Sequence, residues 1–443
     1  MTALDTRTAV SVAGAGPAAA STGAVPTPAA RATPTRFPLD SLRAIAAVSV
    51  VAFHAYQNNR VGAVWPWTGW AHSLAVSSDL AVDLFFAISG FLLWLPVTKA
   101  LLAGRSQRSG GRLVMRRAIR LLPLYYVVLL VAWSLANPVL PGHWQDLLLH
   151  LTLTHVYSDQ YIFWTVGPSW TLAVEFHAYV MVALMLPALT WLTPRLRSRG
   201  RRLAVAWGVP AVLVTIGVWR LSSAILGGTP ETDWSVWFGP LAKAHLFGVG
   251  MALAVLVACG KSVPRWGRRA MVVVAVALVL LGTAFRMEVD PVTAEWTHIL
   301  FAVVCALVLG AIVLNHGTQP RWLSWGPTVW IGTVSYSLYL VHELVMHLLR
   351  DQGLLPPAGS TGGVVVTAAA TLAVSLVVAR LSYTFVERPL VAMVDGVERS
   401  GELYASVGSE ARVVDAPEVG TSLRQGVSSS GEAPPSRRGH GPV

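Results

Sequence analysis

The stretch Leu80–Val97 reads LAVDLFFAISGFLLWLPV and carries a single charged residue, Asp83. As a helix it would rise about 27 Å, close to the roughly 30 Å thickness of a bilayer's hydrocarbon core. The whole chain shares this character, because its 443 residues are 54% hydrophobic and only 12% charged, with a mean hydropathy of +0.57. Ordinary soluble proteins are about one quarter charged. The composition therefore excludes a soluble globular enzyme and predicts an integral membrane protein.

Ten apolar stretches of this kind follow one another along the chain, each long enough or nearly long enough to span a bilayer. They are Leu39–Tyr56, Leu80–Val97, Ile119–Ala136, Trp170–Leu192, Leu203–Leu221, Phe238–Cys259, Ala270–Phe285, Trp296–Leu314, Val329–Leu349 and Gly362–Phe385. A shorter run, Leu147–Leu153, cannot span and is expected to lie at the membrane interface or to re-enter between helices. The sequence thus predicts an all-α integral membrane protein with about ten transmembrane helices.

Two polar segments flank these stretches. Residues 1–36 are rich in Ala, Pro, Thr and Gly, and residues 394–443 combine Ser, Gly and Pro with mixed charge. Neither segment has the periodicity of a helix or strand, so both are predicted to be disordered tails around a transmembrane domain at 37–393. Cys259 and Cys305 lie far apart in apolar segments, and neither a disulfide framework nor a metal site is expected.

Basic residues between the apolar stretches predict the orientation. The net charge of +11 could suggest a nucleic-acid partner, but the arginines form short clusters between apolar runs, which favours a topological role. One set of alternate loops holds seventeen Lys and Arg residues, at 99–120, 195–202, 261–269 and 321. The other set holds four, Arg60, Arg220, Arg286 and Arg350. Because cytoplasmic loops retain basic residues, both tails are predicted to be cytoplasmic in a multi-pass plasma-membrane protein.

Arg43 and His54 lie in the first apolar stretch, eleven residues apart. That separation is close to three helical turns and about 16 Å of rise, so both side chains share one helix face. Ionisable groups inside a span are costly and usually face the bundle interior at a functional site. A single intramembrane histidine is often only a satisfied core residue, but its alignment with an arginine favours a functional role.

Six segments follow one another in order between about Arg36 and Leu390. They are Arg43-Ala44-Ile45 with His54, Asp83-Leu84-Phe85-Phe86-Ala87-Ile88-Ser89-Gly90-Phe91, Arg117-Ala118-Ile119-Arg120 with Leu121-Leu122-Pro123-Leu124-Tyr125-Tyr126, Ser169-Trp170-Thr171-Leu172-Ala173-Val174-Glu175 with Tyr179, Gly332 with Ser335-Tyr336-Ser337-Leu338-Tyr339-Leu340 and His342, and Tyr383-Thr384-Phe385-Val386-Glu387-Arg388-Pro389. Together they resemble the signatures of the membrane-bound acyltransferase family 3, whose members O-acylate glycans, lipids and antibiotics. Ala178 departs from the pattern, since the family more often has an aromatic residue there.

The resemblance implies acyl transfer to a hydroxyl, which needs a base to remove the hydroxyl proton. Imidazole, with an ordinary pKa of about 6.5, suits that task, and His54 is the predicted catalytic base. Asp83 and Glu175 lie toward the predicted outer ends of their helices, so either carboxylate is a candidate to hold the tautomer of the His54 imidazole. The alternative is that both carboxylates pair with Lys243, which in turn could simply snorkel to the outer interface.

The donor that the resemblance implies is acyl-CoA, an anionic cytoplasmic molecule, with no separately bound cofactor. Arg117 and Arg120 lie on the predicted cytoplasmic side, and guanidinium groups bind phosphates through paired hydrogen bonds. Their alternative role is membrane topology alone. Arg43 would lie farther along the same path, where it could hold the pantetheine arm or polarise the thioester carbonyl.

Ser335, Tyr339 and His342 lie on a later span that runs outward. Tyr339 and His342 are three residues apart and share a helix face, so they are predicted either to line the acceptor side or to form core hydrogen bonds. The predicted function is transfer of an acetyl or other short acyl group from acyl-CoA to a carbohydrate-containing acceptor such as a cell-surface glycan or glycolipid. Two alternatives stay open: modification of a secondary metabolite such as a macrolide, and a multi-span transporter or flippase.

Overall fold

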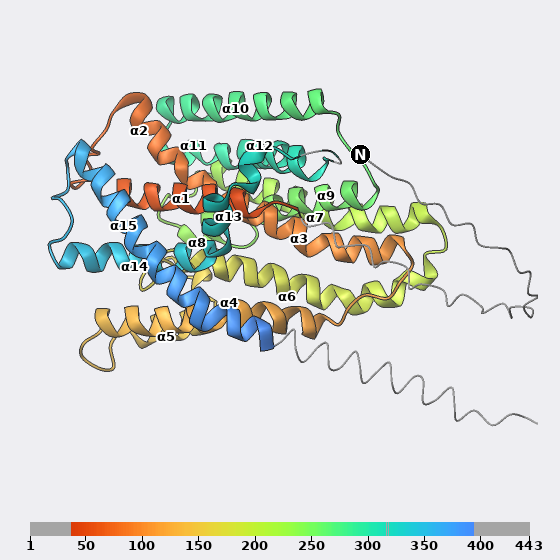
Figure 1. The fold of residues 1–443 in the computed structure, drawn as a ribbon, viewed down its shortest axis with the longest axis horizontal. Helices are drawn as coiled ribbons and strands as arrows, with labels where there is room; N and C mark the ends of the chain where they lie inside the picture. The colour runs from red at the N-terminus through yellow and green to blue at the C-terminus, as the bar shows by residue number, and fades with distance from the viewer. Residues whose placement is uncertain (1–36, 316, 318, 394–443) are drawn as a thin grey trace, which may run out of the picture. The chain divides into compact units, whose positions relative to one another are not determined.

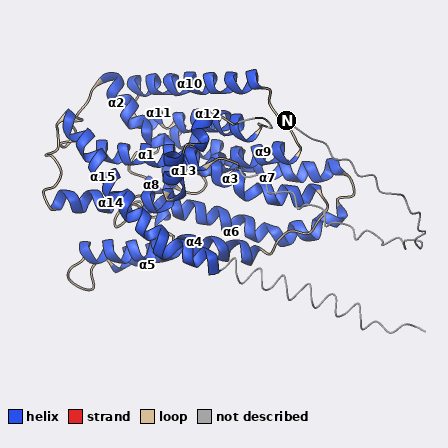
Figure 2. Cartoon of the chain, in the orientation of Figure 1, coloured by secondary structure: helices blue, strands red, loops and turns tan. Residues whose placement is uncertain are grey.

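The computed structural model describes residues 37–315, 317 and 319–393. The chain divides into two units, residues 1–37 and 38–443, and the described part of the second unit is helical. Figure 2 shows no strand among the described residues, where an isolated bridge joins Val61 and Val64. The predicted tails, 1–36 and 394–443, lie outside the described residues. The prediction of an all-α fold is confirmed.

Each of the ten predicted stretches corresponds to a helix. The ten are α1 (Asp40–Gln57), α3 (Ala81–Leu102), α4 (Gly110–Ala136), α6 (Ser169–Leu192), α7 (Arg199–Leu226), α9 (Ala244–Ala258), α10 (Arg265–Glu288), α12 (Trp296–Val313), α14 (Ser335–Asp351) and α15 (Thr361–Ser382). Among the described residues, seven helical segments are long and apolar enough to cross a membrane, and a bent pair makes an eighth. The other two are α9, which is apolar but short, and α1, which carries Arg43 and His54.

Two of the predicted stretches are broken in the structure. Val329–Leu349 divides into α13 (Gly326–Thr333) and α14, whose axes differ by 72°. Phe238–Cys259 begins at the last residue of α8 (Trp234–Phe238), and residues 239–243, which include Gly239 and Pro240, separate α8 from α9. Proline lacks an amide N–H and disfavours the helical conformation of the residue before it, which explains the second break.

Shorter helices lie in the connections. They are α2 (Gly69–Val76), α5 (Trp144–Leu151) and α11 (Pro291–Ala294), together with four 3₁₀ turns, Ser77–Leu80, His155–Tyr157, Thr193–Arg195 and Arg321–Ser324. The eight residues of α5 would rise only about 12 Å, so the run predicted to be too short to span is indeed short. After α15 the chain makes a π-helical turn, Tyr383–Glu387, where the buried Glu387 carboxylate accepts a hydrogen bond from Ser337 of α14.

The middle of the bundle is α3. In Figure 1 it runs alongside α9, α7 and α6, and it also contacts α1 and α12. The most apolar window of the span containing α3 is 72% buried by protein, whereas that of α10, at the upper edge of Figure 1, is 17% buried. Two glycines bring α3 and α9 together, because a Cβ on Gly90 would collide with the carbonyl of Phe247 and one on Gly250 with that of Ala87.

Candidate active site

A pocket opens between α1, α3, α4, α6 and α14, with an empty volume of about 730 Å³ that includes space open to its surroundings. We call it the arginine pocket. Its lining residues are Arg43, Phe85, Phe86, Ser89, Arg117, Arg120, Leu121, Pro168, Thr171, Leu172, Glu175, Tyr179, Ser335, Tyr336, Tyr339 and Leu340. The structure thus brings together side chains from five segments that the sequence separates by almost three hundred residues.

Three guanidinium groups and one carboxylate give the pocket its charge. Arg117 and Arg120 come from the start of α4, whereas Arg43 comes from α1 and Glu175 from α6. Within the described residues, the buried Nε of Arg43 has no hydrogen-bond partner. An arginine-lined pocket with one buried N–H still unpaired is suited to a negatively charged ligand, because planar guanidinium groups bind phosphate and carboxylate oxygens.

The carboxylate of Glu175 is held by two hydroxyl groups. Ser89 of α3 and Tyr179 of α6 both donate hydrogen bonds to its Oε1. The guanidinium carbon of Arg117 lies 4.8 Å from the centre of the Tyr179 ring, a cation–π distance. Glu175 therefore balances part of the arginine charge and also helps to orient Arg117 through Tyr179.

His54 lies beside a second histidine. Its Nδ1 is 3.0 Å from the carbonyl oxygen of Val50 and 3.0 Å from Nε2 of His342, which comes from α14. The two ring centres are 4.8 Å apart. Nδ1 of His342 is 2.6 Å from the carbonyl oxygen of Tyr339. We call His54 and His342 the histidine pair.

The histidine pair is not part of the pocket lining, although Arg43 on the same helix is. Tyr339 connects the two places, since it lines the arginine pocket and its ring centre is 5.8 Å from that of His342. The Tyr339 ring also meets Phe85 edge to face at 5.7 Å. Tyr339 and His342 share a helix face, as their spacing predicts.

Asp83 does not contact His54. Its Oδ2 lies 2.7 Å from Nδ1 of His298, on α12, and the other ring nitrogen of His298 lies 3.4 Å from Glu295. Glu175 is likewise held by hydroxyl groups, so the expectation that one of these two carboxylates orients the imidazole of His54 is not met among the described contacts. The reason is rotational: Asp83 projects from α3 toward α12, and Glu175 projects from α6 into the arginine pocket, where Arg43 of α1 also lies but His54 does not.

Lys243 is buried, and among the described residues it makes no hydrogen-bonded ion pair with Asp83 or Glu175. It is 1% exposed, so it does not snorkel, and within the described residues its Nζ has no hydrogen-bond partner. The ammonium group lies 5.2 Å from the ring centre of Phe238 and 5.9 Å from that of Trp170. Aromatic faces are therefore its direct contacts, and the Lys243 charge also interacts electrostatically with the Asp83 carboxylate.

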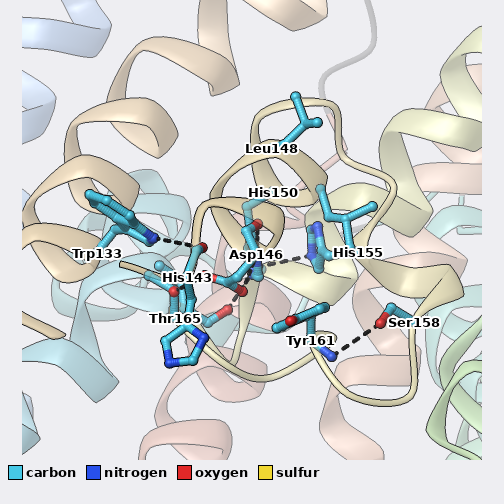
Figure 3. Close-up of polar contacts among 12 residues, drawn as sticks. Trp133, His143, Asp146, Leu148, His150, His155, Ser158, Tyr161 and Thr165 are labelled. Atoms are coloured by element: carbon cyan, nitrogen blue, oxygen red, sulfur yellow. Dashed lines mark hydrogen bonds and ion pairs between the residues drawn. The ribbon is translucent and has the colours of Figure 1, made fainter. Parts of the chain in front are cut away.

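A second polar cluster surrounds α5 and the turn after it (Figure 3). Nδ1 of His150 is 3.0 Å from the Asp146 carboxylate, and the other carboxylate oxygen accepts from Thr165. The ring of His155 stacks on that of His150 at 4.0 Å, and its Nε2 lies 3.1 Å from Oγ of Ser169. Asp146, His150, His155 and Ser169 are fully buried, so this cluster ties α5 to the start of α6 rather than opening to a ligand.

Sequence reasoning missed two contributions to the site. Ser89 lies inside a signature segment but received no role, because a serine in an apolar helix gives no indication of its partner. The hydroxyl of Tyr336 donates to the carbonyl of Leu121 at 2.5 Å and so ties the start of α14 to α4 beside Arg120. Neither role has a sequence signal beyond the motif itself, since both depend on how helices pack.

Comparison with known proteins shows the family of this chain. The family model of acyltransferase family 3, described as an acyltransferase domain, matches residues 38–380. The chain therefore belongs to that family and is an acyltransferase of the transmembrane kind. No solved structure matches the chain significantly.

The chain is also similar to individual named proteins. The chain is 26% identical to the peptidoglycan O-acetyltransferase OatA of Listeria monocytogenes over 80% of its own length and 55% of the relative's. It is 29% identical to the acyltransferase MdmB of Streptomyces mycarofaciens, over 79% of this chain and 90% of that one. It is 26% identical to the putative peptidoglycan O-acetyltransferase YrhL of Bacillus subtilis, over 80% and 54%. The chain thus spans about half the length of the two peptidoglycan relatives.

Proposed function

We propose that this protein transfers an acetyl or other short acyl group from cytoplasmic acyl-CoA to a hydroxyl of a carbohydrate-containing acceptor. The observation that carries the proposal is the convergence of Arg43, Arg117 and Arg120 on one pocket, next to the histidine pair, in which His342 is buried and His54 is half-buried. The arginines suit the phosphates of coenzyme A, and the imidazole suits removal of the hydroxyl proton. The nearness of the arginine pocket to the histidine pair supports this proposal.

The mechanism follows from these positions. Arg117 and Arg120 bind the phosphates, while Arg43 binds the pantetheine arm or polarises the thioester carbonyl. His54 takes the hydroxyl proton as the hydroxyl oxygen bonds to the carbonyl carbon and the C–S bond breaks, and the proton then passes to the thiolate of coenzyme A. In a second route the acyl group first bonds to His54, releasing coenzyme A, before the hydroxyl attacks.

The acceptor is proposed from the relatives. Two of them are named as peptidoglycan O-acetyltransferases, which supports a cell-surface glycan reached from the outer side of the plasma membrane. A secondary metabolite such as a macrolide is the second candidate. It is favoured by the match to MdmB, which covers 90% of that relative and whose name specifies no glycan. In both cases we propose that the donor enters from the cytoplasm, and the loop charges, which favour cytoplasmic termini, support this side.

The test uses the full chain in lipid nanodiscs with acetyl-CoA labelled on the acetyl group. Peptidoglycan fragments and a panel of macrolides are supplied separately, and mass spectrometry measures acetylated product while a thiol reagent measures released coenzyme A. We expect one acetyl group transferred per coenzyme A released, with glycan as the better acceptor, and no transfer by His54→Ala. Movement of an acceptor across proteoliposomes without covalent change would instead support the transporter alternative.

A further inference from the structure

The contact between His54 and His342 limits which ring nitrogens can carry hydrogen. Nδ1 of His342 lies 2.6 Å from the carbonyl oxygen of Tyr339, and a carbonyl only accepts, so this nitrogen carries the hydrogen. His342 is fully buried, which disfavours a second proton on its ring. Its Nε2 is therefore an acceptor.

The same reasoning then assigns the hydrogen on the ring of His54. Nδ1 of His54 faces two acceptors, Nε2 of His342 and the carbonyl oxygen of Val50, each at 3.0 Å. One N–H shared between two acceptors is a three-centre hydrogen bond, so Nδ1 is the protonated nitrogen of neutral His54. This leaves Nε2 of His54 with a free lone pair, the form that a general base needs.

We propose that His342 is a positioning residue that holds His54 in the tautomer with hydrogen on Nδ1 and so presents Nε2 to the acceptor hydroxyl. This inference rests on the proposed function of His54 as the base. In this proposal the neutral imidazole of His342 has the role of the aspartate in a serine–histidine–aspartate triad, which fixes the tautomer of the histidine.

The surroundings explain why a neutral partner suits this site. Each ring of the histidine pair is anchored to a carbonyl of its own helix, Val50 on α1 and Tyr339 on α14, so neither needs a carboxylate to fix its orientation. Asp83, one of the carboxylates that the sequence offered for this role, is paired with His298 instead. A neutral pair also avoids the cost of burying an unpaired charge inside the bundle.

Three variants test the role through activity. His342→Gln places an amide oxygen near the former Nε2, where it can accept from His54, whereas His342→Leu fills the space without an acceptor. His347→Gln is the matched control, because His347 is exposed on the same helix. We expect His342→Leu to lower kcat by at least about tenfold with little change in KM for acetyl-CoA, because general-base catalysis contributes that much or more. His342→Gln should recover much of the loss.

The tautomer itself is measured without catalysis. In protein labelled with ¹⁵N-histidine, ring nitrogens with and without hydrogen resonate apart, and the signals absent from His54→Ala identify His54. We expect Nδ1 of His54 to be protonated in the wild type and His342→Gln, and His342→Leu to show a mixture. An unchanged tautomer in a folded His342→Leu, or equal kcat values for the Leu and Gln variants, would overturn the positioning role. Full activity of His54→Ala would instead overturn the proposed function and leave the tautomer result standing.

Discussion

The ring of Tyr339 lies 5.8 Å from the ring of His342, one turn farther along α14, and Tyr339 also lines the arginine pocket. The tyrosine therefore stands between the proposed donor site and the histidine pair, packed edge to face against Phe85. A residue in that place can exclude water from the path between thioester and base. The position leads to a first prediction about how tightly donor cleavage is linked to transfer.

Tyr339→Ala is expected to separate these two events. Removing the ring opens the path, so coenzyme A should be released without a matching acylated product, while Tyr339→Phe should keep the two equal. The measurement is the ratio of free thiol to acylated acceptor in nanodiscs. If Tyr339→Ala keeps that ratio at one, the ring does not act as a barrier.

His54→Ala should abolish transfer while the protein still inserts, because the base is lost and no span is shortened. Arg43→Lys should also be impaired, since an ammonium group cannot reproduce the planar fork of arginine. Product formation is measured together with the amount of protein in the membrane. Activity within a few-fold of wild type for His54→Ala would remove His54 from the mechanism.

Replacing both Arg117 and Arg120 with Gln should weaken acetyl-CoA binding more than acceptor binding. The salt dependence of donor affinity should fall as well, because screening by salt acts on the charges that have been removed. Arg112→Gln is the matched control, since Arg112 is exposed near the start of the same helix and does not line the pocket. Titration calorimetry at two salt concentrations provides the measurement, and equal affinities in the double variant and the control would restrict the arginines to membrane orientation.

Glu175→Gln should tighten binding of coenzyme A. The change removes the carboxylate from a pocket lined by three arginines and keeps an oxygen that can accept from Ser89 and Tyr179. The pocket then attracts an anion more strongly, because the opposing charge is gone. Tyr179→Phe keeps the carboxylate and serves as the comparison. Weaker binding by a well-folded Glu175→Gln would show that the carboxylate holds the arginines in place instead of opposing the donor.

Reporter fusions test the orientation that the loop charges predict. Fusions after Arg202 and after Arg268 should report the cytoplasm, and a fusion at Pro230 should report the outer side. The pattern follows from seventeen basic residues in one set of loops and four in the other. A cytoplasmic signal at Pro230 would reverse the predicted path of the donor.

Much of the fold could be predicted because lipid imposes simple rules. A spanning helix needs about twenty apolar residues and satisfies its backbone internally, so each helix is visible in its own stretch of sequence. The break at Val334 was not predicted, because the apolar stretch continues through it. The turn at residues 239–243 does carry a sequence signal, Gly239-Pro240, but the stretch was assigned from its hydropathy as a whole.

The site was predicted in part for a related reason. A position on one helix indicates depth and face on that helix, so the shared face of Tyr339 and His342 followed from a spacing of three residues. The partner across a helix interface depends on the rotation and crossing of two helices. The partners of Asp83 and Glu175 could therefore not be assigned from sequence position alone. In the structure Asp83 pairs with His298, and Glu175 accepts hydrogen bonds from Ser89 and Tyr179.

By itself, then, the sequence determined that this chain is a helical membrane protein with intramembrane arginine, histidine and carboxylate groups. The length of an apolar stretch and the charges within it are local properties of the sequence. Because charge inside lipid is costly, a charged residue in such a stretch can be recognised without knowing the fold. Only the tertiary structure decided that His54 meets His342, 288 positions away, and that Arg43, Arg117 and Arg120 share one pocket. Successive residues of a helix point about 100° apart around its axis. Which side chains of two helices meet therefore depends on how those helices pack and rotate against each other.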